Sequence, residues 1–139
     1  MATTIVQKVI FKNTTTKILY DLYMDAKKHA MIAAGPAVIS AKEGSNYSVH
    51  GGYIKGKILK LVRNKLIVQT WRVQNWEKTE TDSVFIIDFE QKEKDVVMHA
   101  THANVPDQHA AHIGKGWHDH YWNPWKQFIA GKPITRPQM

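Results

Sequence analysis

Residues 105–131 read V-P-D-Q-H-A-A-H-I-G-K-G-W-H-D-H-Y-W-N-P-W-K-Q-F-I-A-G, and the remaining elements of the chain are expected to pack around this segment. At about 100° per residue, a helix here would gather most of the large apolar side chains on one side. That side carries Ala110, Ile113, Gly114, Trp117, Tyr121, Pro124, Trp125 and Phe128, whereas Trp122 lies among polar residues on the other side. We predict an amphipathic helix over residues 107–130, with Asp107 capping its start and Gly131 ending it before Pro133.

The residues before this helix predict one strand and two short helices. Alternation at residues 5–11 predicts the strand, and helical patterns follow at 17–24 and 26–33. A cluster of threonines would cap the first helix, and Gly35-Pro36 would end the second. The face that the first helix buries is predicted to hold Ile18, Leu19, Leu22 and Tyr23.

The central part of the chain predicts a sheet. β-Branched and alternating runs predict about six strands, at residues 38–41, 47–50, 53–62, 66–73, 84–90 and 95–103. Since tight turns join these runs, we expect an antiparallel meander with one face to bury, and the long aromatic helix is the element that can cover it. The fold class is therefore α+β.

The length of 139 residues predicts a single domain, residues 1–131, followed by a flexible tail at 132–139. The chain has no cysteine, which excludes disulfide and thiolate chemistry. Its first residues lack the apolar core of a signal peptide and no run is long enough to span a membrane, so we expect a cytoplasmic protein.

The formal net charge of +7 raises the question of nucleic-acid binding. The basic residues, however, alternate with apolar ones, as is typical of the solvent-exposed face of strands, and no nucleic-acid-binding motif accompanies them. We interpret the excess as a solvated basic face.

The predicted element order is similar to the helix-grip layout of the START and birch-pollen-allergen-like (SRPBCC) superfamily. Local motifs resemble the activator of heat-shock protein 90 ATPase family. They are G-Y-I-K-G-K-I from Gly52, L-I-V-Q-T-W-R from Leu66 followed by Trp76, Asp82-Ser83, Val105-Pro106, and Gly116-Trp117 followed by Tyr121-Trp122.

This resemblance covers residues 5–129 and implies a helix-grip fold of six to seven antiparallel strands. It also implies a non-enzymatic, chaperone-associated or stress-response module, with a heat-shock protein 90 family chaperone as partner. In the eukaryotic activator, such a module forms the C-terminal half, behind a separate domain that makes much of the chaperone contact.

The aromatic residues allow two interpretations: a filled core, or a cavity for a small hydrophobic ligand between helix and sheet. The cavity residues would be Trp71, Phe85, Phe89, Ile113, Trp117, Tyr121 and Trp125. A second candidate site is an exposed partner surface, because Trp and Arg are enriched at protein–protein contacts. It would consist of Arg72, Trp76, Lys55 and Lys57.

The eight histidines suggest a metal site, and His109 and His112 could share a metal ion on one helix face. The spacing places no third ligand, so we predict neither metal nor cofactor. No nucleophile with an adjacent base, paired carboxylates or phosphate loop is recognisable, so we predict no enzyme. The alternative is a cavity histidine, His50 or His102, that acts on a bound ligand.

Overall fold

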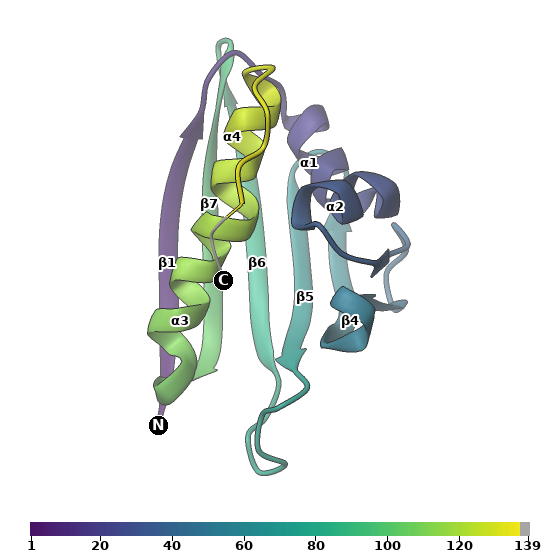
Figure 1. The fold of residues 1–139 in the computed structure, drawn as a ribbon, viewed down its shortest axis with the longest axis vertical. Helices are drawn as coiled ribbons and strands as arrows, with labels where there is room; N and C mark the ends of the chain where they lie inside the picture. Colours follow the sequence, from purple (N-terminus) through teal and green to yellow (C-terminus); the bar gives the residue numbers. More distant parts are fainter. Residues whose placement is uncertain (137–139) are drawn as a thin grey trace.

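The computed structural model describes residues 1–136, in which one seven-stranded antiparallel sheet curves around a long C-terminal helix (Figure 1). The elements are β1 (Ala2–Phe11), α1 (Thr16–Met24), α2 (Ala26–Ala33), β2 (Ala37–Val38), β3 (Asn46–Val49), a 3₁₀ turn η1 (His50–Gly52), β4 (Ile54–Val62), β5 (Leu66–Val73), β6 (Ser83–Lys92), β7 (Asp95–Pro106), α3 (Asp107–Trp117), a π-helical turn η2 (His118–Trp122) and α4 (Asn123–Ile129). This confirms the predicted helix-grip fold.

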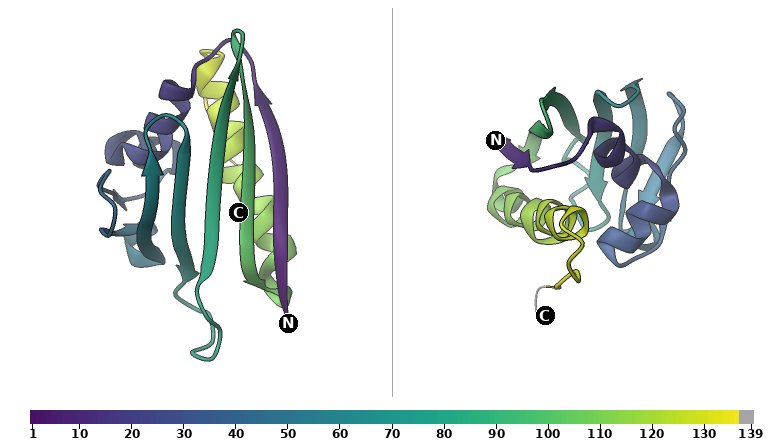
Figure 2. Two further views of the ribbon diagram at one scale, coloured as in Figure 1. Left: turned by 180° about the vertical axis from the view of Figure 1, so that it is seen from behind. Right: turned by 90° about the horizontal axis from the view of Figure 1, so that it is seen from above.

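The strand order in the sheet is β1-β7-β6-β5-β4-β3-β2. The helices of residues 1–136 lie on the concave side of the sheet, and in this part of the chain none covers the opposite side (Figure 2). β5 has the predicted bounds, and β1 begins earlier than predicted because Ala2 and Thr3 pair with the extended end of β7 at Pro106 and Val105. β2 is shorter than the predicted run at 38–41. No helix of the described residues is long and apolar enough to cross a membrane.

The long helix runs through α3, η2 and α4 without a break, and its π-helical turn changes which side chains face the sheet. Trp122, expected on the polar side, is fully buried, and Phe128, expected in the core, is 40% exposed. The cause is the wider turn: an α-helical wheel of constant pitch fails across a π-helical segment, so that the adjacent Tyr121 and Trp122 both point inward. The indole N–H of Trp122 donates to the Gln7 side-chain oxygen at 2.7 Å.

The start of this helix also differs from the prediction. The N-cap is Pro106, which offers no side-chain cap, and Asp107 is the first helical residue. The Asp107 carboxylate instead accepts a hydrogen bond from the Thr3 hydroxyl of β1. The predicted stop is confirmed, because Gly131 has φ 70° and its N–H donates to the Phe128 carbonyl.

The two short helices lie where they were predicted, but the residue that ends α2 and the exposure of one side chain of α1 differ from the prediction. α2 has the predicted bounds, but the left-handed residue that ends it is Ala34, not Gly35. In α1, Leu19, Leu22 and Tyr23 are buried as expected. Ile18 is exposed, because the buried face of the helix extends instead to Tyr20 on the other side of Leu19. Residues 132–136 of the expected tail fold back: Thr135 bonds Gln127, and Arg136 donates to the Ile32 and Met31 carbonyls. Residues 137–139 of that tail lie outside the described residues.

Candidate ligand-binding pocket

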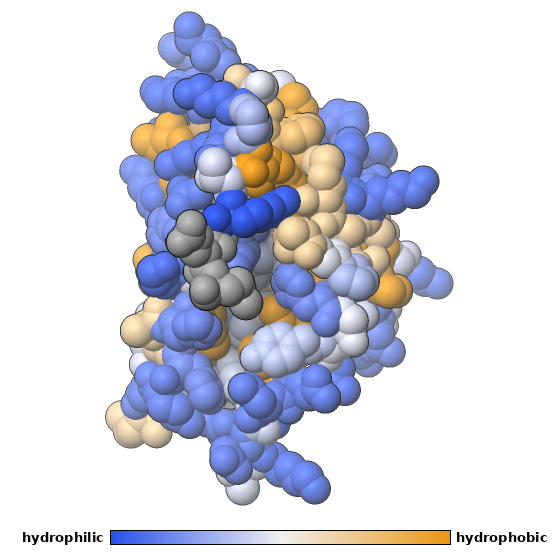
Figure 3. Space-filling view, viewed as in Figure 1, coloured by the Kyte–Doolittle hydropathy of each residue, from blue (hydrophilic) through white to orange (hydrophobic). Residues whose placement is uncertain are grey.

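A pocket of about 350 Å³ lies between the N-terminal half of the long helix and a wall formed by η1, β4 and β5. Four of the predicted cavity residues line it: Trp71, Ile113, Trp117 and Tyr121. All four are buried, so they form an apolar floor. The space-filling view shows apolar surface at this hollow, between the long helix and η1, with hydrophilic residues around it (Figure 3).

The other three predicted cavity residues, Phe85, Phe89 and Trp125, lie outside this pocket. The Phe85 ring stacks on Trp117 with ring centres 3.9 Å apart and an interplanar angle of 5°. Phe89 and Trp125 are fully buried against each other, nearer α4. The helix–sheet interior is therefore filled around Phe85, Phe89 and Trp125, and the pocket with the aromatic lining lies on the α3 side.

Imidazole rings surround the apolar floor. His50 comes from η1, and His109, His112 and His120 come from the facing helix. The Trp76 ring stacks almost parallel to the His109 ring, with centres 5.9 Å apart. Asp119, the pocket's only lining carboxylate among the described residues, accepts a hydrogen bond from Lys115. The pocket thus has an aromatic floor and a rim of groups that gain positive charge when protonated.

The backbone holds His50 at this rim. His50 has φ 56°, a left-handed conformation that is uncommon outside glycine, and Gly51 and Gly52 follow with φ 67° and 93°. Its ring packs over Gly35, where an added Cβ would lie 2.6 Å from Nδ1. Burial, and then the charge of His120, lower the pKa of His50. Sequence reasoning singled out His50 but missed that Gly35 makes room for its ring.

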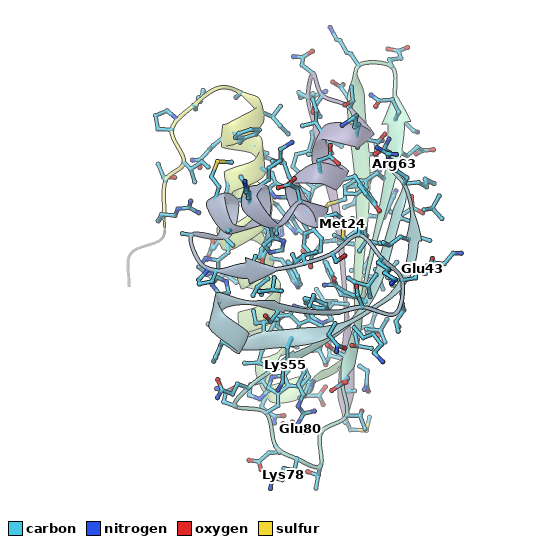
Figure 4. The ribbon with its side chains drawn as sticks, turned by 90° about the vertical axis from the view of Figure 1, so that its right-hand side faces the viewer. Met24, Glu43, Lys55, Arg63, Lys78 and Glu80 are labelled. Carbon is cyan, nitrogen blue, oxygen red and sulfur yellow. The ribbon has the colours of Figure 1, made fainter. Side chains whose placement is uncertain are left out.

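The predicted partner surface is not an exposed Trp–Arg patch. Trp76 is only 6% exposed because the chain after β5 folds its ring between Trp71 and His109. Arg72 donates to the carbonyls of Glu77 and Glu80 and so holds the β5–β6 loop. Lys55 and Lys57 are exposed as expected; Figure 4 shows Lys55 on β4 and Lys78 at the tip of that loop.

The other catalytic candidate, His102, lies outside the pocket in the core. The Trp117 indole N–H donates to its Nδ1, so the proton sits on Nε2, which donates to the Ser83 hydroxyl; Ser83 in turn donates to the Trp71 carbonyl. Burial lowers the pKa of His102 to about 3. Its hydrogen-bond partners are thus a serine and a tryptophan, and no carboxylate is bonded to it. We therefore interpret His102 as a structural histidine.

A second buried histidine, His29, is also hydrogen-bonded through both ring nitrogens. His29 Nδ1–H donates to the Tyr23 carbonyl, and Nε2 accepts from the Tyr121 hydroxyl, both at 2.8 Å. Burial is the main cause that lowers the pKa of His29 to about 4. Within residues 1–136, no three His, Cys, Asp or Glu side chains are grouped to hold a metal ion, so His109 and His112 have no third ligand.

The curved antiparallel sheet, the long helix across it and the pocket between them define a helix-grip protein. The chain belongs to the Activator of Hsp90 ATPase homolog 1-like protein family, whose family model matches residues 13–128. The resemblance found in the sequence motifs is thereby confirmed.

Individual relatives agree with this assignment. Over 64 residues the chain is 31% identical to the activator of 90 kDa heat shock protein ATPase homolog 2 of Mus musculus, covering 46% of this chain and 19% of that protein. An HSP90 activator from Plasmodium falciparum has a similar structure, with a TM-score of 0.83 at 19% identity over 94% of this chain and 97% of that one. The Aha1 dimer from Colwellia psychrerythraea gives a TM-score of 0.80 at 16% identity, over 94% and 99% of the two chains. The match thus spans about a fifth of the mouse relative.

Proposed function

We propose that this chain is a binding protein without catalytic activity of its own, and that it associates with a chaperone of the heat-shock protein 90 family. The observation that carries the proposal is the family match over residues 13–128, which includes both walls of the pocket and six of the seven strands. A role in the stress response and a cytoplasmic location belong to the same proposal.

The outer face of β4 is the surface that best suits such a partner. Lys55 and Lys57 are exposed there, and a bulge between Ile58 and Lys60 turns both Leu59 and Lys60 to solvent. Leu59 is 45% exposed, so this face combines basic charge with apolar surface. An acidic chaperone surface would be attracted to it, and the apolar side chain would add affinity after encounter.

Mechanistically, such a module would act by population shift. If it binds one conformation of the chaperone ATPase more tightly than another, it favours that conformation by the difference in binding free energy. This requires no reacting group on the module itself.

The test is a binding titration with a heat-shock protein 90 homologue at low salt. Lys55→Glu with Lys57→Glu should weaken binding by roughly tenfold, about 1.4 kcal/mol. The control is Lys27→Glu with Lys28→Glu, which changes the net charge equally on the exposed side of α2, away from the sheet. Equal effects of both pairs would reject the β4 face, and no association at tens of micromolar would reject the chaperone partner.

A second function is favoured by one observation, the pocket of about 350 Å³ with an apolar floor. Small-molecule sites have volumes from about 300 Å³ upward and combine apolar walls with a few polar groups. Binding of a small ligand beneath the long helix would therefore be an alternative to chaperone binding, or would control it. Ligand-induced rise of the melting temperature tests this function independently of any chaperone.

A further inference from the structure

The chemistry of the pocket walls narrows the class of ligand beyond a small hydrophobic molecule. The floor is built from flat rings: Trp71 and Trp117 have ring centres 5.9 Å apart, and Trp76 lies 5.8 Å from Trp71. Indole faces favour stacking or edge contacts with another aromatic ring. With about 350 Å³ available, the pocket has room for one small ring system rather than a long lipid chain.

The rim favours an anionic group on that ligand. The charged or titratable groups on the helix wall are His109, His112, Lys115, Asp119 and His120, together with Tyr121. The facing wall contributes His50 and Tyr53, and β5 contributes only uncharged side chains. Asp119 accepts a hydrogen bond from Lys115, and its charge also interacts with His120. The rim therefore carries one carboxylate, already paired with a lysine, against four imidazoles and that lysine.

We propose that the pocket binds a small aromatic carboxylate, with its ring against Trp71 and Trp117 and its carboxylate held between His50 and His120. The inference rests on the small-ligand function proposed above. His50 is specially placed for this task, since its left-handed backbone and the gap above Gly35 hold the ring at the rim. His120 belongs to the π-helical turn, a feature that is frequent at functional sites.

Binding should tighten when the pH falls. Burial, and then the charge of His120, lower the pKa of His50, and a bound carboxylate would offset both effects. The complex therefore takes up a proton more readily than the free protein, and affinity rises by roughly fivefold as the pH falls from about 7 to about 5.5.

The experiment is isothermal titration of the full chain with three probes: 1-naphthoate, its neutral analogue 1-naphthamide, and the aliphatic acid decanoate. We expect naphthoate to bind roughly tenfold more tightly than either of the others, about 1.4 kcal/mol. The pH dependence is expected for naphthoate and absent for naphthamide.

Two variants test the role of His50. His50→Asn keeps a residue that tolerates the left-handed conformation and removes the imidazole. Gly35→Ala leaves His50 in the chain but displaces its ring, since the new methyl group would lie 2.6 Å from Nδ1. Both should weaken naphthoate binding by at least roughly fivefold and leave naphthamide binding unchanged. The control is His99→Asn, on the exposed outer side of β7, which should change neither.

The possible failures are distinguishable. If none of the three probes binds, the small-ligand function falls and this inference falls with it. If naphthamide binds as tightly as naphthoate, or if His50→Asn has no effect, a ligand pocket stands but the carboxylate assignment is overturned. Decanoate binding as tightly as naphthoate would overturn the aromatic assignment alone.

Discussion

The indole N–H of Trp117 donates a hydrogen bond to Nδ1 of His102 at 3.0 Å. A residue of the long helix thereby determines which nitrogen of the buried imidazole carries the proton. His102 must stay neutral to accept this bond. The contact couples the helix to β7 and β6 through Ser83, and it makes the stability of the fold sensitive to acid.

We expect stability to fall as the pH drops from about 6.5 to about 4.5, before most carboxylates are protonated. The pKa values of His102 and His29 are lowered to about 3 and about 4 in the folded chain. The unfolded chain therefore binds more protons in this range, which favours unfolding by on the order of 5 kcal/mol at about pH 4.5. Melting temperature measured against pH tests this, and a constant value across that range would contradict the buried neutral state.

Trp117→Phe tests the hydrogen bond separately from the packing. Phe retains a ring that can stack on Phe85 but leaves His102 Nδ1 without its donor, at an expected cost of about 1–3 kcal/mol. Trp117→Ala also removes the stacked ring and should cost about 3–5 kcal/mol. Urea unfolding measures both, and a cost below about 1 kcal/mol for the alanine variant would show that Trp117 is not part of the core.

The π-helical turn predicts that substitutions of two aromatic residues of the long helix have effects of very different size. Trp122→Ala should cost about 3–5 kcal/mol because its side chain is fully buried and bonded to Gln7. Phe128→Ala should cost less than about 1 kcal/mol since Phe128 is 40% exposed. A regular α-helix would reverse the order, so the pair reports on the register of the helix directly.

Arg72→Glu should lower stability by about 1–3 kcal/mol, because the Arg72 side chain donates to two loop carbonyls and lies over the Trp76 ring. Lys55→Glu, directly opposite in the strand register, should leave the melting temperature within about a degree, since Lys55 is exposed. If Arg72→Glu were as stable as wild type, the loop would not depend on this contact. A loss of chaperone binding by a variant of unchanged stability would then show that Arg72 contributes to the partner surface.

Local sequence patterns determined most of the elements of this protein. The run from Leu66 to Val73 is a strand with the predicted bounds, and residues 26–33 form the predicted helix. β-Branched content, helical periodicity and glycine at Gly131 act over a few residues, so they can be recognised without knowing the fold. The order of these elements was similar to the helix-grip architecture, and the local motifs around Trp71 and Trp117 pointed to the family.

Only the tertiary structure decided which side chains face the pocket. Trp122 and Phe128 exchange their expected environments because the π-helical turn His118–Trp122 shifts the register of the helix, and a helical wheel of constant pitch cannot represent that turn. Trp76 is buried because the loop after β5 folds back toward α3, where His109 stacks on it.

The same holds for the rim of the pocket. His50 and His120 are seventy residues apart in the chain and meet only because η1 and η2 form opposite walls of the pocket. Gly35 matters because the ring of His50, from a distant turn, packs against it. Long-range contacts of this kind depend on the packing of the whole sheet and helix, whereas the periodicity of a single segment reports only on that segment.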